Sequence, residues 1–230
     1  MSFLKFLKHA LKAVIPPKAF IKFLIWKRGY PEPELRLIKI LSDKNKISID
    51  VGASEGLYTA HLFLNSRKCI AFEPRKEASV ELSKITAGLD PPVQIETVAL
   101  SDFTGEAQLK IFAGDAGRST FEEANLIENE GQIEIVPIVV KKLDDYDFEC
   151  EIGFMKIDVE GYEMKVLMGA LKVIGTARPR IIVETHTIEL ENEVRAFLKN
   201  LNYAEPKEYG RKTNKDGTEH VNLFFMPNVE

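Results

Sequence analysis

The stretch ISIDVGASEGLYTA, residues 47–60, contains the pattern that decides how the chain folds. An apolar run leads to Asp50, then Gly52 and Gly56 follow, and a helix-like segment begins after them. A strand, a glycine-containing turn and a helix in this order are typical of the first unit of a parallel α/β sheet. Ligands of such sheets bind beyond the carboxyl ends of the strands, so this turn is the first place to look for a site.

The turn does not match either common phosphate-binding pattern. A dinucleotide fingerprint needs the frame GxGxxG, but Ser54 and Leu57 stand where the frame that starts at Gly52 requires its second and last glycines. The GK[ST] ending of a phosphate loop is also absent. The acidic residues in the turn and at the ends of the predicted strands are Asp50, Glu55, Glu73 and Asp102. A pyrophosphate among these carboxylates would be repelled, by about 1 kcal/mol per pair at ~4 Å in water and by more when buried.

A cationic ligand reverses this argument, and S-adenosylmethionine has the required charges. Its sulfonium and ammonium groups are positive, its binding needs close backbone approach, and its ribose diol can donate hydrogen bonds to a carboxylate. We therefore predict that Glu73, 23 positions after Asp50, accepts bonds from the ribose and that Asp102 accepts one from the adenine amine. The alternatives are that Asp50 only caps a strand end and that Asp102 is a turn residue beside Gly105.

The rest of the chain alternates between strand-like and helix-like segments. Predicted strands cover residues 47–51, 68–72, 93–100, 153–158 and 180–185, and predicted helices cover 57–65, 75–87, 162–173 and 189–200. This alternation predicts a Rossmann-like α/β fold whose mostly parallel sheet carries helices on both faces. A strand near Tyr203 and the segment HVNLFFM, residues 220–226, predict an antiparallel C-terminal pair.

Between residues 105 and 140 the pattern changes to two further strands, EAQLKIF and QIEIVPIVV, joined by a polar loop. This β insertion is a natural place for substrate contacts, because binding residues concentrate on loops that a rigid scaffold positions. The residues that we predict to contact the acceptor are Arg118, Ser119 and Thr120. The alternative is that this loop is solvated and contacts nothing.

A second group of charged residues ends the fourth predicted strand. In FMKIDVEGYEMKVLMGA, residues 154–170, Lys156, Asp158 and Glu160 occupy alternate positions, and Gly161 then permits a sharp turn into a helix. Three charges that leave a buried strand would be costly without partners, so we predict a site that holds the cofactor's ammonium or the acceptor. The alternative is an internal ion pair of Lys156 with one of the acids.

Several segments, in this order, resemble the FkbM family of methyltransferases. They are SIDVGASEGLYT, AFEP, VALSDFTGEAQL, KIDVEGYEMKVLMGA and IIVETH, and KxDxEGxE is the family's hallmark. The resemblance covers roughly residues 45–226 and implies a class I S-adenosylmethionine-dependent methyltransferase, typically acting on hydroxyl groups of sugars or polyketide-like products. It also implies that Asp158, Glu160 and Gly161 line the reaction side. The full set of predicted cofactor residues is Asp50, Gly52, Ala53, Glu55, Gly56, Glu73, Pro74, Ser101, Asp102 and Asp158.

Methyl transfer is an in-line displacement, so the protein must align the acceptor oxygen with the methyl carbon and the sulfur. A sugar hydroxyl is a poor nucleophile at neutral pH, and a neighbouring group should take its proton during attack. We predict that His186, just after the fifth strand, is this base, with Glu184, Asp158 and Glu160 as alternatives. These residues could also bind a divalent cation, but no HxxxH or paired-carboxylate spacing requires one, and we predict no metal.

Charge is unevenly distributed along the chain. The sequence has 31 Lys and Arg residues and 35 Asp and Glu residues. Residues 1–29 hold seven of the basic residues and no acidic one, so the rest of the chain has a net charge of −11. An acidic body lacks the basic surface that nucleic-acid binding needs, so we predict no nucleic-acid partner. Apolar residues at three- and four-residue spacing before Pro16 predict a basic amphipathic helix in an arm, residues 1–34, ahead of the methyltransferase domain, residues 35–230. The arm either lies on an anionic membrane or packs on the domain.

Lysines interrupt every apolar run of the arm before a signal-peptide core or a membrane span could form, and Cys69 and Cys150 have no CxxC partner. We therefore predict a cytoplasmic protein, with peripheral membrane contact through residues 1–29 as one option and the oligomeric state open. The predicted function is O-methylation of a hydroxyl on a sugar, glycan or polyketide-like metabolite. The alternatives are an N-methyltransferase, a protein or RNA methyltransferase, or a non-catalytic membrane-associated binding module on the same fold.

Overall fold

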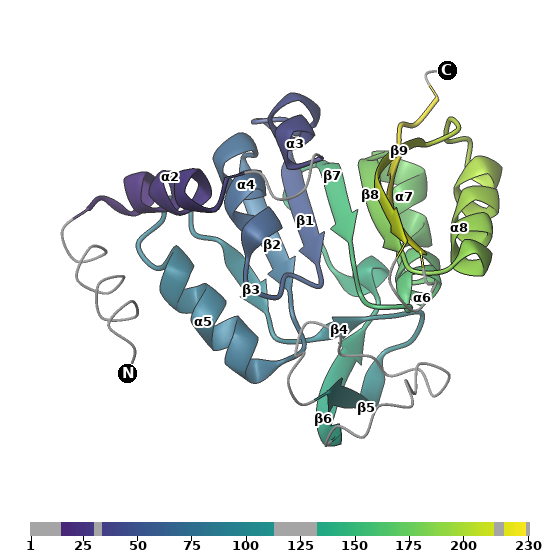
Figure 1. Ribbon diagram of the computed structural model, residues 1–230, viewed down its shortest axis with the longest axis horizontal. Coiled ribbons are helices and arrows are strands. Elements are labelled where there is room, and N and C mark those ends of the chain that lie inside the picture. Colours follow the sequence, from purple (N-terminus) through teal and green to yellow (C-terminus); the bar gives the residue numbers. More distant parts are fainter. Residues whose placement is uncertain (1–14, 30–33, 113–132, 214–218, 229–230) are drawn as a thin grey trace.

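A central twisted sheet lies between two layers of helices, with a smaller sheet at its edge (Figure 1). The structure, a computed structural model, describes residues 15–29, 34–112, 133–213 and 219–228. The helices are α2 (Pro17–Arg28), α3 (Leu35–Leu41), α4 (Leu57–Asn65), α5 (Lys76–Thr86), the short 3₁₀ helix η1 (Leu143–Asp145), α6 (Glu163–Met168), α7 (Leu171–Ala177) and α8 (Ile188–Asn200). The strands are β1 (Ile47–Val51), β2 (Lys68–Phe72), β3 (Gln94–Glu96), β4 (Ala99–Leu100), β5 (Gly105–Phe112), β6 (Ile133–Lys141), β7 (Ile152–Ile157), β8 (Arg180–Thr185), β9 (Lys207–Thr213) and β10 (Glu219–Phe225).

The large sheet has seven strands in the order β3-β2-β1-β7-β8-β10-β9. Within this sheet, each neighbouring pair among β3, β2, β1, β7 and β8 is parallel. Strand β10 is antiparallel to both of its neighbours, β8 and β9. This confirms the predicted Rossmann-like sheet with an antiparallel C-terminal strand. The strand order reverses between β1 and β7, so the carboxyl ends of these two strands flank the place where such sheets bind ligands.

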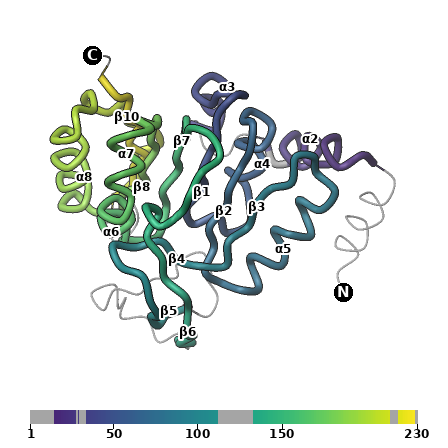
Figure 2. Tube along the Cα trace, turned by 180° about the vertical axis from the view of Figure 1, so that it is seen from behind, coloured from purple at the N-terminus to yellow at the C-terminus, as the bar shows by residue number. Residues whose placement is uncertain are grey.

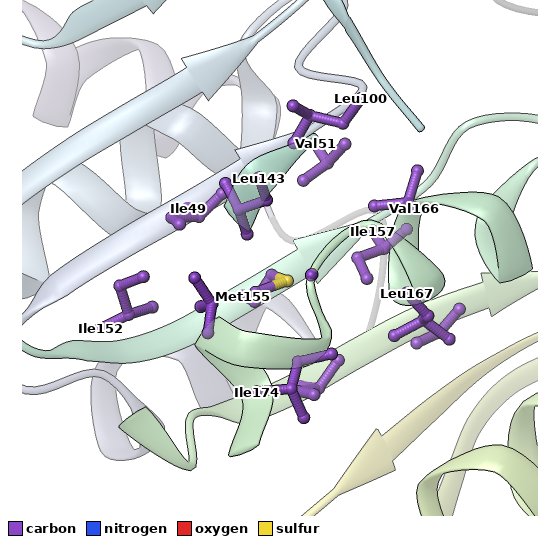
Figure 3. Close-up of a cluster of buried hydrophobic side chains, with 14 of the residues drawn as sticks. Ile49, Val51, Leu100, Leu143, Ile152, Met155, Ile157, Val166, Leu167 and Ile174 are labelled. Carbon is purple, nitrogen blue, oxygen red and sulfur yellow. The ribbon is translucent and has the colours of Figure 1, made fainter. Parts of the chain in front are cut away.

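Side chains of β1 alternate between the two faces of the sheet. Ile49 and Val51 join the buried apolar cluster beneath α6 and α7, together with Ile174 (Figure 3). Each such fully buried aliphatic side chain stabilises the fold by roughly 1.5–3 kcal/mol. Asp50 points to the opposite face, where Thr59 of α4 donates a hydrogen bond of 2.5 Å to its carboxylate. Successive residues of β1 therefore face an apolar core on one side of the sheet and a buried polar pair on the other.

The opposite face of the sheet is covered by α3, α4 and α5, and α2 packs outside α4 and α5. In α2, Phe20 and Ile21 are buried, and Ile21 belongs to an apolar cluster with Leu35 and Tyr58. The tube in Figure 2 shows α2 beside α4 and α5, which it contacts. The described part of the predicted arm therefore packs on the domain through one side of a helix. The helix predicted before Pro16 falls on residues 1–14, outside the described residues.

The second sheet has the order β4-β6-β5. In it β4 runs parallel to β6, and β5 pairs antiparallel with β6 along its whole length. Ala99, Leu109, Ile138 and Val140 form its own small apolar cluster. This is the predicted β insertion. Its polar loop, which contains the predicted acceptor residues Arg118, Ser119 and Thr120, lies outside the described residues.

Two predicted elements are each divided in the structure. The prediction of one strand over 93–100 was wrong, because β3 stays in the large sheet and β4 pairs with β6 of the small one. The prediction of one helix over 162–173 was wrong too, because the chain bends at Gly169. A Cβ there would lie 1.8 Å from the carbonyl oxygen of Ser101. The carboxylate of Asp144 then accepts two backbone N–H groups of α7, each at 2.9 Å.

The C-terminal antiparallel pair is present but begins later than predicted. Tyr203 makes only an isolated bridge to Pro227, and β9 begins at Lys207. The hydroxyl of Tyr203 instead donates to the backbone oxygen of Pro179 at 2.8 Å. Tyr203 therefore anchors the end of α8 to the core and is not part of the pair.

Candidate active site

A cavity of about 240 Å³ opens at the carboxyl ends of β1, β2 and β7. Its wall comes from the loops that follow these strands and from apolar residues of β4 and β5. The sequence-predicted residues that line it are Gly52, Glu73, Pro74, Asp158 and Glu160. The cavity therefore lies where an open α/β sheet is expected to bind a ligand, and it brings together both acidic groups found in the sequence.

Glu73 joins the first two loops of the cavity. Its side chain is buried, and Oε2 accepts the backbone N–H of Ser54 at 2.8 Å. Oε1 accepts the backbone N–H of Arg75 at 3.0 Å and its Nε–H at 2.8 Å. Sequence reasoning did not assign Arg75, although it lines the cavity. Arg75 could have been assigned from the sequence, because in FEPR it follows Glu73 by two residues.

Gly52 allows the first loop to approach the loop that follows β7. Its φ is +79°, in the left-handed region, and its N–H donates to the carbonyl oxygen of Phe72 at 3.0 Å. A Cβ at this position would lie 1.8 Å from the carbonyl oxygen of Asp158. Gly56 also has a positive φ, +78°, where α4 begins, but a Cβ there would meet only the end of the Leu82 side chain, at 2.4 Å. The close backbone contact therefore depends on Gly52.

Six predicted cofactor residues do not line the cavity. They are Asp50, Ala53, Glu55, Gly56, Ser101 and Asp102. Asp50 is buried beneath α4, and this burial raises the pKa of its carboxyl to about 6 although Thr59 donates to it. Asp102 accepts a hydrogen bond of 2.9 Å from Nζ of Lys165. Direct contact of these residues with the cofactor stays a prediction.

Lys156 is enclosed by acidic and aromatic side chains. Its side chain is 1% exposed, and Nζ lies 3.2 Å from Oδ2 of Asp158 and 3.7 Å from Oε2 of Glu184. Nζ also lies 4.6 Å from the ring centroid of Tyr58. Burial alone would raise the pKa of Asp158, but Lys156 and His186 hold it well below its usual range. The internal ion pair considered from the sequence is therefore present, and Asp158 belongs both to it and to the cavity wall.

A buried carboxylate that the sequence analysis did not assign holds the loop between β7 and α6. Glu163 accepts the backbone N–H of Val159 at 3.0 Å and that of Gly161 at 3.1 Å. Burial raises the pKa of Glu163. Glu160, within this loop, has a φ of +56°, a left-handed conformation that costs a non-glycine residue roughly 1–2 kcal/mol. Glu163 is the last acid of KxDxEGxE, so the motif contained a signal for it.

His186, the predicted base, faces two carboxylates. Its Nε2 lies 3.9 Å from Oδ1 of Asp158 and 3.6 Å from Oε2 of Glu160. Burial by itself disfavours the charged ring, but the nearby negative charges of Asp158 and Glu160 outweigh it and raise the pKa of His186 to about 9. At neutral pH the ring is therefore an imidazolium and already carries the proton that a base would have to accept.

A family model described as the methyltransferase FkbM domain matches residues 50–205, which is more than half of the chain. The chain belongs to the FkbM methyltransferase family. This confirms the family that the motifs resemble. A search of the curated proteins finds no match.

Solved structures share the fold of this FkbM-family chain at low sequence identity. The FkbM methyltransferase from Methylobacillus flagellatus KT is 17% identical with a TM-score of 0.54; the match covers 79% of this chain and 44% of that one. An rRNA methylase from Streptococcus thermophilus is 12% identical, with a TM-score of 0.54 and coverage of 85% and 95%. SMU.1697c from Streptococcus mutans, in complex with SAH, is 14% identical, with a TM-score of 0.53 and coverage of 84% and 96%. This chain thus spans less than half the length of the first of these proteins.

His186 links the stability of this FkbM-family protein to pH. Folding raises its pKa from 6.5 to about 9, so its stabilising contribution is fully present below pH 6.5 and is lost as the pH rises through about 9. We expect this contribution to be about 1–3 kcal/mol. The free energy of unfolding, measured by urea denaturation at a series of pH values, should therefore decline more over this range in the parent than in a His186→Gln variant.

A His61→Gln variant is the control for this measurement. Burial lowers the pKa of His61, so the effect of that residue on stability develops as the pH falls below 6.5. His61→Gln should therefore keep the decline above pH 6.5. Equal declines in the parent and in His186→Gln would show that His186 is not held in its charged form by the folded protein.

Three residues of the FkbM-family site also lie close enough together to hold a metal ion. One ligand atom each from Asp158, Glu184 and His186 lies within 4.8 Å of the others. Nζ of Lys156 contacts two of these side chains and places a positive charge beside them. That charge opposes a cation at the same point. The absence of a metal stays a prediction.

Proposed function

We propose that this FkbM-family methyltransferase transfers a methyl group to a hydroxyl oxygen of a small-molecule or glycan acceptor. S-Adenosylmethionine is the methyl donor, as the family and the class I fold indicate. One observation chiefly supports the hydroxyl acceptor: the carboxylates of Glu73 and Glu160 line the same cavity. The first suits a ribose, and the second can take a hydroxyl proton.

The residues around the cavity fit S-adenosylmethionine. Glu73 offers two buried carboxylate oxygens to the ribose hydroxyls, although Arg75 now donates to them. Val98 and Leu109 belong to an apolar part of the wall that suits the face of an adenine ring. The charge of Asp158 favours the cofactor's cationic groups. When bound, the cofactor supplies an electrophilic methyl carbon.

Among the four predicted catalytic groups, Glu160 is best placed to take the acceptor's proton. Glu160 lines the cavity, and Nε2 of His186 lies 3.6 Å from its Oε2. His186 is charged at neutral pH, and Lys156 and His186 make Asp158 a weak base by lowering its pKa. Glu184 lies beside Lys156 and does not line the cavity. In this proposal Glu160 is the base, and the imidazolium of His186 positions it.

RNA methylation is the second candidate function, because an rRNA methylase has a similar fold. That likeness is at 12% identity and reaches no further than the fold. The chain outside residues 1–29 carries a net charge of −11, from 24 basic and 35 acidic residues. Phosphate groups would be repelled by such a surface, whereas a neutral hydroxyl compound would not. We therefore favour the hydroxyl acceptor.

Transfer of a labelled methyl group from S-adenosylmethionine tests this function. The full chain is incubated with a panel of glycans and hydroxylated polyketide-like compounds and, separately, with total RNA. We expect label in a hydroxyl compound, and we expect Glu160→Gln to lower kcat about a hundredfold because the proton acceptor is lost. Glu149→Gln, at an exposed carboxylate, is the control and should keep the parent's kcat. Label in RNA alone would refute the proposal.

The pH dependence of the same reaction distinguishes Glu160 from His186. Carboxylic acids ionise well below neutral pH, so with Glu160 as the base kcat/KM should change little between pH 6.5 and 9. If His186 were the base, kcat/KM would rise about tenfold per pH unit until about pH 9, because only the neutral ring can accept a proton. Such a rise would assign the base to His186.

A further inference from the structure

Helix α2 has two faces of different character. Phe20 and Ile21 are buried against the domain, whereas the residues on the other side of the helix face the solvent. This surface, the α2 solvent face, consists of the half-buried Phe23 and of the exposed residues Lys18, Ala19, Lys22, Trp26 and Lys27. Trp26 is 78% exposed, the highest value among the large apolar side chains in the described part of the chain. Packing within the domain therefore does not explain why this position is a tryptophan.

Trp26 lies at the centre of the α2 solvent face. At 3.6 residues per turn, Lys18 and Lys22 lie on one side of it and Lys27 on the other. The ring of Phe23 lies beside it, with 6.0 Å between the two ring centroids. Aromatic rings flanked by lysines suit a membrane surface, because the rings enter the headgroup region while the long lysine stems carry their charges to the lipid phosphates.

The charge of the chain favours the same contact. Residues 15–29, which include α2, contain four basic residues and no acid, whereas residues 30–230 carry a net charge of −11. Both views place α2 at one end of the molecule, outside α4 and α5, with α8 at the opposite end (Figures 1 and 2). An anionic surface would therefore attract the α2 end of the molecule and repel the rest of it.

We propose that the α2 solvent face binds the surface of an anionic lipid bilayer. Within the described ranges, no helix has both the length and the apolar character needed to cross a bilayer. The 12 residues of α2 are fewer than the ~20 that a membrane span requires, so in this proposal α2 lies along the surface. Each lysine near an anionic membrane contributes about 1 kcal/mol, so its three lysines together account for about a hundredfold in affinity. A nucleic acid is a polyanion too, but the acidic body would oppose a strand that extends from α2 to the cavity.

The fluorescence of Trp26 tests this contact directly, because it is the only tryptophan in the sequence. The full chain is titrated with vesicles of phosphatidylcholine alone and with vesicles that also contain phosphatidylglycerol. We expect the emission to shift to shorter wavelength, and brominated lipids to quench it, only with the anionic vesicles. Added salt should weaken the binding, since lysines and lipid phosphates attract each other through screened charges.

Two triple variants separate the α2 solvent face from net charge in general. Replacing Lys18, Lys22 and Lys27 by glutamine should weaken vesicle binding about a hundredfold. The control replaces three exposed lysines elsewhere with glutamine and should bind as the parent does; these are Lys199, Lys207 and Lys212. Three results would overturn the proposal: no binding to anionic vesicles, binding that leaves the emission of Trp26 unchanged, or a shift produced by polyuridylic acid and not by vesicles.

Discussion

A Gly52→Ala variant is expected to lose both stability and cofactor binding. The added Cβ would lie 1.8 Å from the carbonyl oxygen of Asp158, a backbone atom that cannot move unless the loop after β7 moves with it. The φ of +79° adds a cost of about 1 kcal/mol for any residue with a Cβ. We expect the free energy of unfolding to fall by roughly 3–5 kcal/mol. Urea denaturation measures the loss, and calorimetric titration with S-adenosylmethionine should detect no binding.

Gly175→Ala is the matched control for this substitution. Gly175 lies within α7, and a Cβ there would meet nothing within 4 Å. Because alanine is the better helix former, this variant should be as stable as the parent or more stable by up to about 1 kcal/mol. If Gly52→Ala were equally stable and bound the cofactor, the close contact between the first loop and the loop after β7 would not exist in the protein.

Glu73→Gln is expected to weaken the binding of S-adenosylmethionine by roughly a hundred- to ten-thousandfold. The carboxylate is buried beside the cavity, and two charge-assisted hydrogen bonds from a ribose are worth about 1.5–3 kcal/mol each. The amide removes the negative charge and presents an N–H₂ group to donors that already point at this position, the N–H of Ser54 and the guanidinium of Arg75. Calorimetric titration measures the change in Kd.

Glu77→Gln provides the comparison, because Glu77 is an exposed carboxylate four positions later, in the first turn of α5. Its Kd should equal that of the parent. Thermal unfolding of both variants shows whether a change in Kd reflects lost contacts or lost folding. A Glu73→Gln variant that is folded and binds as tightly as the parent would remove Glu73 from the proposed cofactor site.

Much of the fold could be predicted from the sequence because its signals are local. The ranges predicted for β1, β2, β8 and α4 agree with the structure at both ends. Buried parallel strands are continuous apolar runs, and these runs end at charged residues or glycines that are visible in the chain itself. The breaks at Thr97 and Gly169 were missed because each depends on a partner distant in sequence, β6 in one case and Ser101 in the other.

The site was predicted in part, for the same reason. Acidic residues at the ends of parallel strands must lie near one edge of the sheet, and Glu73, Asp158 and Glu160 do meet at the cavity. The side chain of Asp50 turns to the α4 face, because it is next to the last residue of β1 and its neighbours face the core. Asp102 pairs with Lys165, 63 positions away, which no spacing rule could indicate.

The sequence by itself determined the order of strands and helices, the family and the edge of the sheet where the site lies, because these follow from apolar periodicity and from motifs of neighbouring residues. Tertiary structure alone decided which carboxylates face the cavity and which protonation state His186 adopts. Its ring became an imidazolium only when folding placed Asp158 and Glu160 beside it, since a pKa responds to charges that are close in space, whatever their separation along the chain.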